Sequence, residues 1–263
     1  MSLLLSEKKI KLITKIFKKS AMNSKNFFVE FLIKLSKFIP KYIPLPIIRG
    51  PLRGFKWITS AAAGEAKGLS ILVNFVEPKQ IAIAKKLMRE DFICFDIGAN
   101  VGLYSLLFSR YAKSVYAFES LLRNVQYLAK TLAYNSVKNV KIIPYAVSNT
   151  NKPSFFKEGL DHSRGKLDNN GNIPILTISL DMFVSKTKIN PNLIKIDVEG
   201  AELCVLKGAK NLLSNEKPII LLSTHGYQTK IDCLRYLKKL NYQEIKILNA
   251  SSIEKASEFV IKP

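Results

Sequence analysis

Residues 95–102 read Phe95-Asp96-Ile97-Gly98-Ala99-Asn100-Val101-Gly102, and this stretch decides the fold. The apolar run at 92–97 predicts a strand, and the pattern at 102–111 predicts a helix. Gly98 permits a tight turn and a close approach of a ligand to the backbone, and Gly102 lets the helix pack near the strand. The free N–H groups at the start of that helix complete a turn that is suited to part of a nucleotide-like molecule.

An acidic residue distinguishes this turn from the GxGxxG fingerprint of dinucleotide-binding proteins, because Asp96 precedes the first glycine and only two glycines follow, four positions apart. A carboxylate at this position would repel a pyrophosphate but suits a cationic amino group. The turn therefore points away from NAD and toward S-adenosylmethionine, which carries an ammonium, a sulfonium and a ribose. The second predicted strand, 114–119, ends in Glu119, whose carboxylate can accept hydrogen bonds from both ribose hydroxyls.

Strand and helix patterns continue to alternate along the chain. Further strands are predicted at 140–145, 193–197, 218–223, 242–248 and 258–261, and further helices at 121–134, 201–213 and 229–240. This alternation predicts an α/β fold with a mainly parallel sheet covered on both faces, closed by a final antiparallel pair. The polar insertion at 148–172 is a candidate for a hairpin.

Two acids, Asp197 and Glu199, follow the fourth strand of the predicted sheet, at the edge where ligands of open α/β folds bind. Glu202 lies in the first turn of the next helix, so we expect it to cap the positive end of that helix. Lys195 lies within the strand, and because lysine is rarely buried unpaired, we expect it to pair with a carboxylate.

A histidine, His225, follows the fifth strand, which the expected sheet order places beside Asp197 and Glu199. A histidine with a near-neutral pKa can take a proton from a substrate hydroxyl, and the alternative is a histidine that only hydrogen-bonds a loop. Two carboxylates raise the question of a divalent metal, but two acids and one histidine are too few to claim one. No metal is predicted.

The net charge is +21, from 41 Lys and Arg against 20 Asp and Glu, and residues 1–60 hold 13 of the former and 2 of the latter. At 48% hydrophobic residues the chain is too apolar for global disorder. Residues 27–39 predict a basic amphipathic helix that either docks on protein or lies in a membrane interface, and the prolines up to residue 51 predict an extended connector. We expect a basic helical extension with connector at 1–60 and a cofactor-binding domain at 61–263.

Three cysteines, Cys94, Cys204 and Cys233, lie far apart without CxxC spacing, so neither structural zinc nor a disulfide framework is expected. Residues 1–9 make a poor signal peptide, and no stretch reaches about 18 uncharged apolar residues. These features predict a cytoplasmic protein, with peripheral attachment to a membrane through the basic extension left open.

The motifs in combination resemble the FkbM family of S-adenosylmethionine-dependent methyltransferases over roughly residues 75–245. The resemblance rests on residues 96–102, 117–119, 180–181, 195–202 and 206–209. It implies the Rossmann-like fold of class I methyltransferases, with a seven-stranded sheet that has one antiparallel strand, and methyl transfer to a hydroxyl of a sugar, glycan or small metabolite. Many similar members have an acid after the fifth strand, where this chain has His225, which makes His225 the residue to test.

The resemblance also implies a set of cofactor-binding residues. The methionine part would lie at the turn, the ribose at Glu119 and the adenine after the third strand. The residues are Asp96, Gly98, Ala99, Asn100, Gly102, Glu119, Tyr145 and Ala146.

The function expected from the sequence is O-methylation (EC 2.1.1.-), with Asp197, Glu199 and His225 as candidates for the base and for orienting the acceptor. One alternative is an RNA methyltransferase that uses the basic surface, but no RNA-binding motif is appended, so nucleic acid is not the expected partner. Another is a nucleotide-binding or membrane-associated protein without catalysis. The expected partners are a hydroxyl-bearing acceptor and, through the basic extension, an anionic membrane surface.

Overall fold

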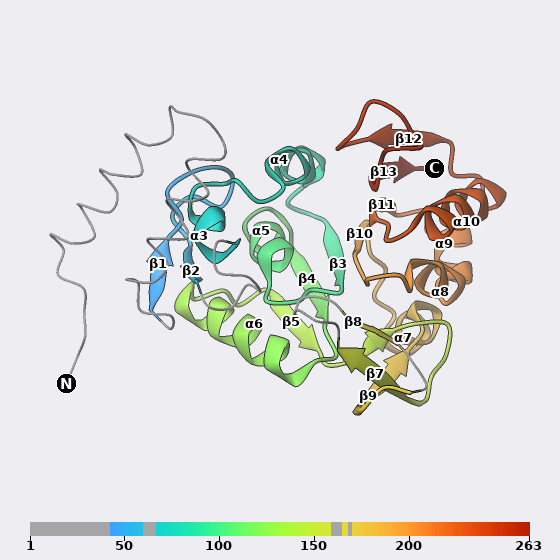
Figure 1. Cartoon of the computed structure of the whole chain (residues 1–263), viewed down its shortest axis with the longest axis horizontal. Coiled ribbons are helices and arrows are strands. Elements are labelled where there is room, and N and C mark those ends of the chain that lie inside the picture. The colour runs from blue at the N-terminus through green and yellow to red at the C-terminus, as the bar shows by residue number, and fades with distance from the viewer. Residues whose placement is uncertain (1–42, 60–66, 159–164, 168–169) are drawn as a thin grey trace, which may run out of the picture. The chain divides into compact units, whose positions relative to one another are not determined.

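The structure, a computed structural model, describes residues 43–59, 67–158, 165–167 and 170–263 (Figure 1). The chain forms two compact units, residues 1–78 and 79–263. The predicted amphipathic helix at 27–39 and the predicted domain boundary at residue 61 lie outside the described residues, and both stay predictions. Within the described ranges, no helix is long and apolar enough to cross a membrane.

The first unit contains a short antiparallel pair, β1 (Pro44–Pro46) and β2 (Lys56–Ile58), followed by helix α3 (Lys67–Leu72). The completely buried side chain of Trp57 anchors β2. The proline-rich segment predicted as an extended connector therefore contains a paired strand. Proline is tolerated in such a pair because its missing N–H can face away from the partner strand.

The second unit is built on a seven-stranded sheet with the order β12-β13-β11-β10-β3-β4-β5. The pairings from β11 through β10, β3 and β4 to β5 are parallel, whereas β13 runs antiparallel to both of its neighbours. This confirms the predicted seven-stranded sheet with one antiparallel strand. Its strands are β3 (Ile93–Ile97), β4 (Ser114–Phe118), β5 (Val140–Ile143), β10 (Leu193–Ile196), β11 (Ile219–Ser223), β12 (Glu244–Ile247) and β13 (Glu258–Lys262).

Helices cover both faces of this sheet, as predicted (Figure 1). Helices α5 and α6 pack on one face and α7 to α10 on the other, with β10 buried at every position between them. The helices are α4 (Pro78–Leu87), α5 (Leu103–Tyr111), α6 (Leu122–Tyr134), α7 (Leu180–Thr187), α8 (Glu202–Lys207), α9 (Lys210–Asn215) and α10 (Tyr227–Lys239).

The polar insertion supplies β7 and β8 of a second sheet with the order β6-β9-β7-β8. Its strands are β6 (Ala146–Val147), β7 (Pro153–Glu158), β8 (Gly165–Leu167) and β9 (Ile173–Ile178). Strands β7 and β8 pair antiparallel, which confirms the candidate hairpin. Strand β9 and the following helix α7 were not predicted.

The prediction of a single helix at 201–213 is wrong. The structure has two helices there, α8 and α9, and the break between them lies at Gly208. The carbonyl oxygen of Gly208 accepts a hydrogen bond from the backbone N–H of Asp181. The carboxylate of Asp181 then accepts hydrogen bonds from the N–H groups of Asn211 and Leu212 at 3.0 and 2.9 Å. Capping by a distant side chain thus starts a new helix.

Candidate active site

The turn after β3 is shaped by two glycines in the left-handed region of the backbone. Gly98 has a φ of 76°, and a Cβ atom there would lie 1.9 Å from the carbonyl oxygen of Asp197. Gly102 has a φ of 98°, and a Cβ atom there would lie 2.4 Å from a side-chain carbon of Leu128. The backbone contact at Gly98 leaves no room for a side chain, and the positive φ favours glycine at both positions. The turn therefore lies directly against the residue that follows β10.

Asp96 is buried on β3, just before the turn, with 1% of its surface exposed. Ser105 donates a hydrogen bond to its Oδ2 atom at 2.6 Å, whereas Oδ1 has no hydrogen-bond partner among the described residues. Burial raises the pKa of Asp96, an effect that the Lys195 ammonium opposes. A buried carboxylate oxygen without a donor is costly, and a cationic N–H group that reached this oxygen would offset the cost.

Glu119 is 7% exposed and holds the same turn from the end of β4. Its Oε2 accepts the backbone N–H of Asn100 at 2.9 Å, and its Oε1 accepts that of Leu121 at 2.8 Å. The N–H of Ala99 donates to the carbonyl of Phe118 at 2.9 Å. Burial raises the pKa of Glu119, although these hydrogen bonds oppose the rise. The side chain of Asn124 and the backbone of Ser120 also hydrogen-bond this carboxylate, and its role toward a ribose stays a prediction.

Tyr145 and Ala146 follow β5, the next strand of the sheet after β4. The N–H of Tyr145 donates to the carbonyl of Ile143 at 2.8 Å, and Ala146 begins β6, where it pairs with Thr177. All the residues predicted to bind the cofactor therefore lie at or after the carboxyl ends of three neighbouring strands, β3, β4 and β5. The structure does not test their individual roles.

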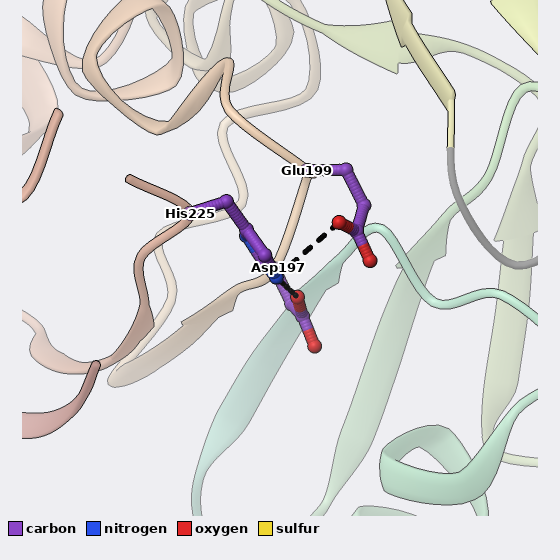
Figure 2. A group of neighbouring side chains, drawn as sticks. All are labelled: Asp197, Glu199 and His225. Atoms are coloured by element: carbon purple, nitrogen blue, oxygen red, sulfur yellow. Dashed lines mark ion pairs between the residues drawn. The ribbon is translucent and has the colours of Figure 1, made fainter. Parts of the chain in front are cut away.

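Asp197, Glu199 and His225 are brought together at the carboxyl ends of β10 and β11 (Figure 2). The Nε2 atom of His225 lies 3.4 Å from Oε2 of Glu199 and 3.8 Å from Oδ1 of Asp197. The backbone of Glu199 (φ 51°) and Gly200 (φ 100°) is left-handed at both residues, which turns the chain after β10. We call these three side chains the acidic–histidine cluster.

Glu202 is a fourth member of this site that the sequence did not place there. It is fully buried at the start of α8, and its Oε1 lies 2.7 Å from Nδ1 of His225. The same oxygen accepts the N–H of Gly200 at 3.0 Å. Gly200 lies before α8, so this bond holds the turn, and the expected capping of the helix N–H groups by Glu202 stays a prediction. Sequence spacing gives no sign that the carboxylate also reaches the loop after β11, because that contact joins residues 23 positions apart.

The carboxylates around His225 change its protonation. The hydrogen bond with Glu202 raises the pKa of His225 to about 9, against the effect of burial and with help from the charges of Asp197 and Glu199. The imidazole of the unliganded protein is therefore protonated at neutral pH. The sequence predicted a near-neutral pKa for His225. That prediction is wrong, because three carboxylates surround the imidazole and raise its pKa.

Asp197 stays ionised for a different reason. Burial alone would raise its pKa, but the Lys195 ammonium, 2.9 Å from Oδ2, and the charge of His225 outweigh burial and lower the pKa. Lys195 is buried, and its Nζ atom lies 4.4 Å from the ring centroid of Tyr104. The prediction that Lys195 pairs with a carboxylate is confirmed.

The two parts of the site belong to neighbouring strands. The turn 98–102 follows β3, the acidic–histidine cluster follows β10 and β11, and β3 pairs directly with β10. A ligand held at the turn and a second molecule held at the cluster would therefore lie side by side at one edge of the sheet.

Comparison with known proteins shows the family of the chain and supports its fold. The methyltransferase FkbM domain family matches residues 96–244, more than half of the chain. The hexuronic acid methyltransferase AglP of Haloferax volcanii is 31% identical over 147 residues, which cover 54% of this chain and 60% of that protein. The match thus spans about three-fifths of the relative's length. The crystal structure of methyltransferase FkbM from Methylobacillus flagellatus has a TM-score of 0.52 at 19% identity, over 68% of this chain and 45% of that one, and it supports the fold.

Proposed function

We propose that this chain, which belongs to the FkbM methyltransferase family, transfers a methyl group from S-adenosylmethionine to a hydroxyl oxygen of a sugar. The observation that carries the proposal is the pairing of β3 with β10, which sets the glycine turn beside the acidic–histidine cluster. The sugar is supported by the relative from Haloferax volcanii, which is a hexuronic acid methyltransferase.

The turn suits S-adenosylmethionine on the chemistry of its atoms. The unpartnered Oδ1 of Asp96 matches the ammonium of the methionine part. The carboxylate of Glu119 would face the ribose, and Tyr145 and Ala146 would face the adenine. Bound there, the cofactor supplies a methyl group on a positively charged sulfur, which is already a strong electrophile.

The acidic–histidine cluster would act on the acceptor. Asp197, Glu199 and His225 orient the hydroxyl toward the methyl group and take up its proton as the new C–O bond forms, while the sulfur keeps the electrons of the broken C–S bond. A pKa of about 9 makes His225 a stronger base than an ordinary histidine but leaves it protonated at neutral pH. It must release that proton before it can accept another.

Substitution of His225 by alanine tests the proposal. We expect His225→Ala to bind S-adenosylhomocysteine as the wild type does, by calorimetry, and to lose most of its turnover in a methyl-transfer screen against hexuronic acids and other glycans, because the acceptor side alone is damaged. Glu244→Gln, at an exposed carboxylate on β12, is the control and should change neither quantity. A wild type without affinity for S-adenosylhomocysteine would contradict the proposal, and unchanged turnover in His225→Ala would remove His225 from the mechanism.

A further inference from the structure

We propose that Asp197, Glu199 and His225 bind a divalent metal ion. Each offers one ligand atom, and these atoms all lie within 4.8 Å of one another. In an octahedral site with metal–ligand distances of about 2.1 Å, neighbouring ligand atoms lie about 3 Å apart and opposite ones about 4 Å apart. The separations of 3.4 and 3.8 Å from Nε2 of His225 to the two carboxylates fall between these values.

A buried carboxylate behind the histidine distinguishes this cluster from a chance group of surface acids. A histidine that binds metal almost always contacts a carboxylate or carbonyl through its other ring nitrogen, which fixes the tautomer and the ring orientation. Glu202 holds this position, with no exposed surface and with Oε1 at 2.7 Å from Nδ1 of His225. The Nε2 atom thereby faces Asp197 and Glu199, where the ion would lie and would take the place of the Nε2 proton.

The charges of the site also favour a cation. Three carboxylates, those of Asp197, Glu199 and Glu202, surround one imidazole, and Lys195 pairs with Asp197. A divalent ion between the first two carboxylates would offset their repulsion. Binding it requires a neutral imidazole, so uptake of the ion would release a proton.

The donor atoms suggest which ion fits. Carboxylate oxygens suit Mg²⁺ and Mn²⁺, and a single imidazole nitrogen is compatible with Mn²⁺ and its neighbours in the first transition row. The side chains of Asp197, Glu199 and His225 are 29%, 32% and 37% exposed, so water or an acceptor hydroxyl can complete the coordination shell. This use of the ion rests on the proposed methyl transfer but changes the group that takes the proton, because a His225 bound to the ion can no longer act as the base. The ion would make the hydroxyl more acidic, and the proton would pass to solvent water.

Titration with Mn²⁺ alone, followed by the loss of the electron paramagnetic resonance signal of free Mn²⁺, tests the site in the full chain. We expect one Mn²⁺ per chain, displaced by excess Mg²⁺. Glu199→Gln and His225→Gln should each weaken binding at least tenfold, because the first removes the negative charge of a ligand and the second removes the imidazole nitrogen. Glu202→Gln should weaken Mn²⁺ binding about 10- to 100-fold, although Glu202 contacts His225 and not the ion. Glu244→Gln should bind as the wild type does, and thermal melting would confirm that every variant folds.

Two outcomes would overturn the metal site: no saturable binding of Mn²⁺ at millimolar concentration, or an affinity left unchanged in both Glu199→Gln and His225→Gln. Methyl transfer that persists at full rate in EDTA would overturn the role of the ion in the reaction while leaving the proposed function in place. Conversely, saturable Mn²⁺ binding in a protein without affinity for S-adenosylhomocysteine would support the site and contradict the proposed function.

Discussion

Gly98 and Gly200 both have a positive φ, but they differ in what surrounds them. A Cβ atom at Gly98 would meet the carbonyl of Asp197, whereas a Cβ atom at Gly200 would have no other atom within 4 Å. We expect Gly200→Ala to cost only the left-handed backbone, about 1–2 kcal/mol. We expect Gly98→Ala to cost more than about 3 kcal/mol, because the end of β10 would have to move.

Urea unfolding of the two glycine variants, with calorimetry of S-adenosylhomocysteine binding, checks this prediction. Gly98→Ala should lose cofactor affinity, and Gly200→Ala should keep it. Equal losses of stability would show that the close contact with Asp197 does not constrain the turn.

The three cysteines should differ in reactivity. Burial raises the pKa of Cys94 and of Cys233 to about 12, and Asp96 adds to the rise at Cys94. Because the thiolate is the reactive form, both thiols should stay protonated and inert at pH 8 to 9, whereas the partly exposed Cys204 should react. Mass spectrometry after iodoacetamide treatment should find one modified cysteine in the native protein and three in urea. Native modification of Cys94 would contradict this.

At the scale of single residues, the sequence predicts the members of the cluster but not their electrostatics. Asp197, Glu199 and His225 follow apolar strands directly, and parallel strands bring their carboxyl ends to one edge. The contact between Glu202 and His225 depends on where two side chains point after the strands have paired, and no local pattern encodes that. The raised pKa of His225 was missed for the same reason.

At the scale of elements, Asp181 on α7 caps the start of α9 through two backbone N–H groups. Asp181→Ala should lower the free energy of unfolding by about 1–2 kcal/mol, because these groups lose their acceptor. Asp181→Asn keeps one acceptor oxygen and should cost less. Urea unfolding measures both losses, and affinity for S-adenosylhomocysteine should not change. If Asp181→Ala were as stable as the wild type, the cap would not support the break at Gly208.

Several strands of the central sheet can be predicted because each is a clearly bounded apolar run. Strands β3, β4, β10 and β11 are short apolar runs with turn or polar residues at their ends, and each begins and ends within one residue of its prediction. Strand β9 is a short alternation of exposed and buried residues directly after the polar insertion, and α7 has only eight residues, so neither gives a strong sequence pattern. The break between α8 and α9 was missed because its cap comes from a segment about 30 positions earlier in the chain.

At the scale of the whole molecule, about half of the net positive charge lies in a segment separate from the cofactor motifs. Residues 1–60 contain 13 Lys and Arg against 2 Glu, and residues 1–40 alone contain 9 Lys and 2 Glu. If this segment binds anionic membranes, deleting residues 1–40 should abolish cosedimentation with phosphatidylglycerol vesicles and leave affinity for S-adenosylhomocysteine intact. Binding by the full chain should weaken as salt rises, because surface charges are screened. Vesicle binding that survives the deletion would contradict this interpretation.

The pairing of β3 with β10 also has a kinetic consequence. A hydrogen bond at this junction, from Ile93 to the side chain of Asn192, joins residues 99 positions apart. Closing so long a loop costs chain entropy before any contact offsets it, which makes such a pairing one of the slower steps of folding. The glycine turn and the acidic–histidine cluster come from opposite sides of this junction. A newly made chain would therefore have no complete site until its two halves have met, so the ability to bind both substrates together should arise only with the final assembly of the sheet.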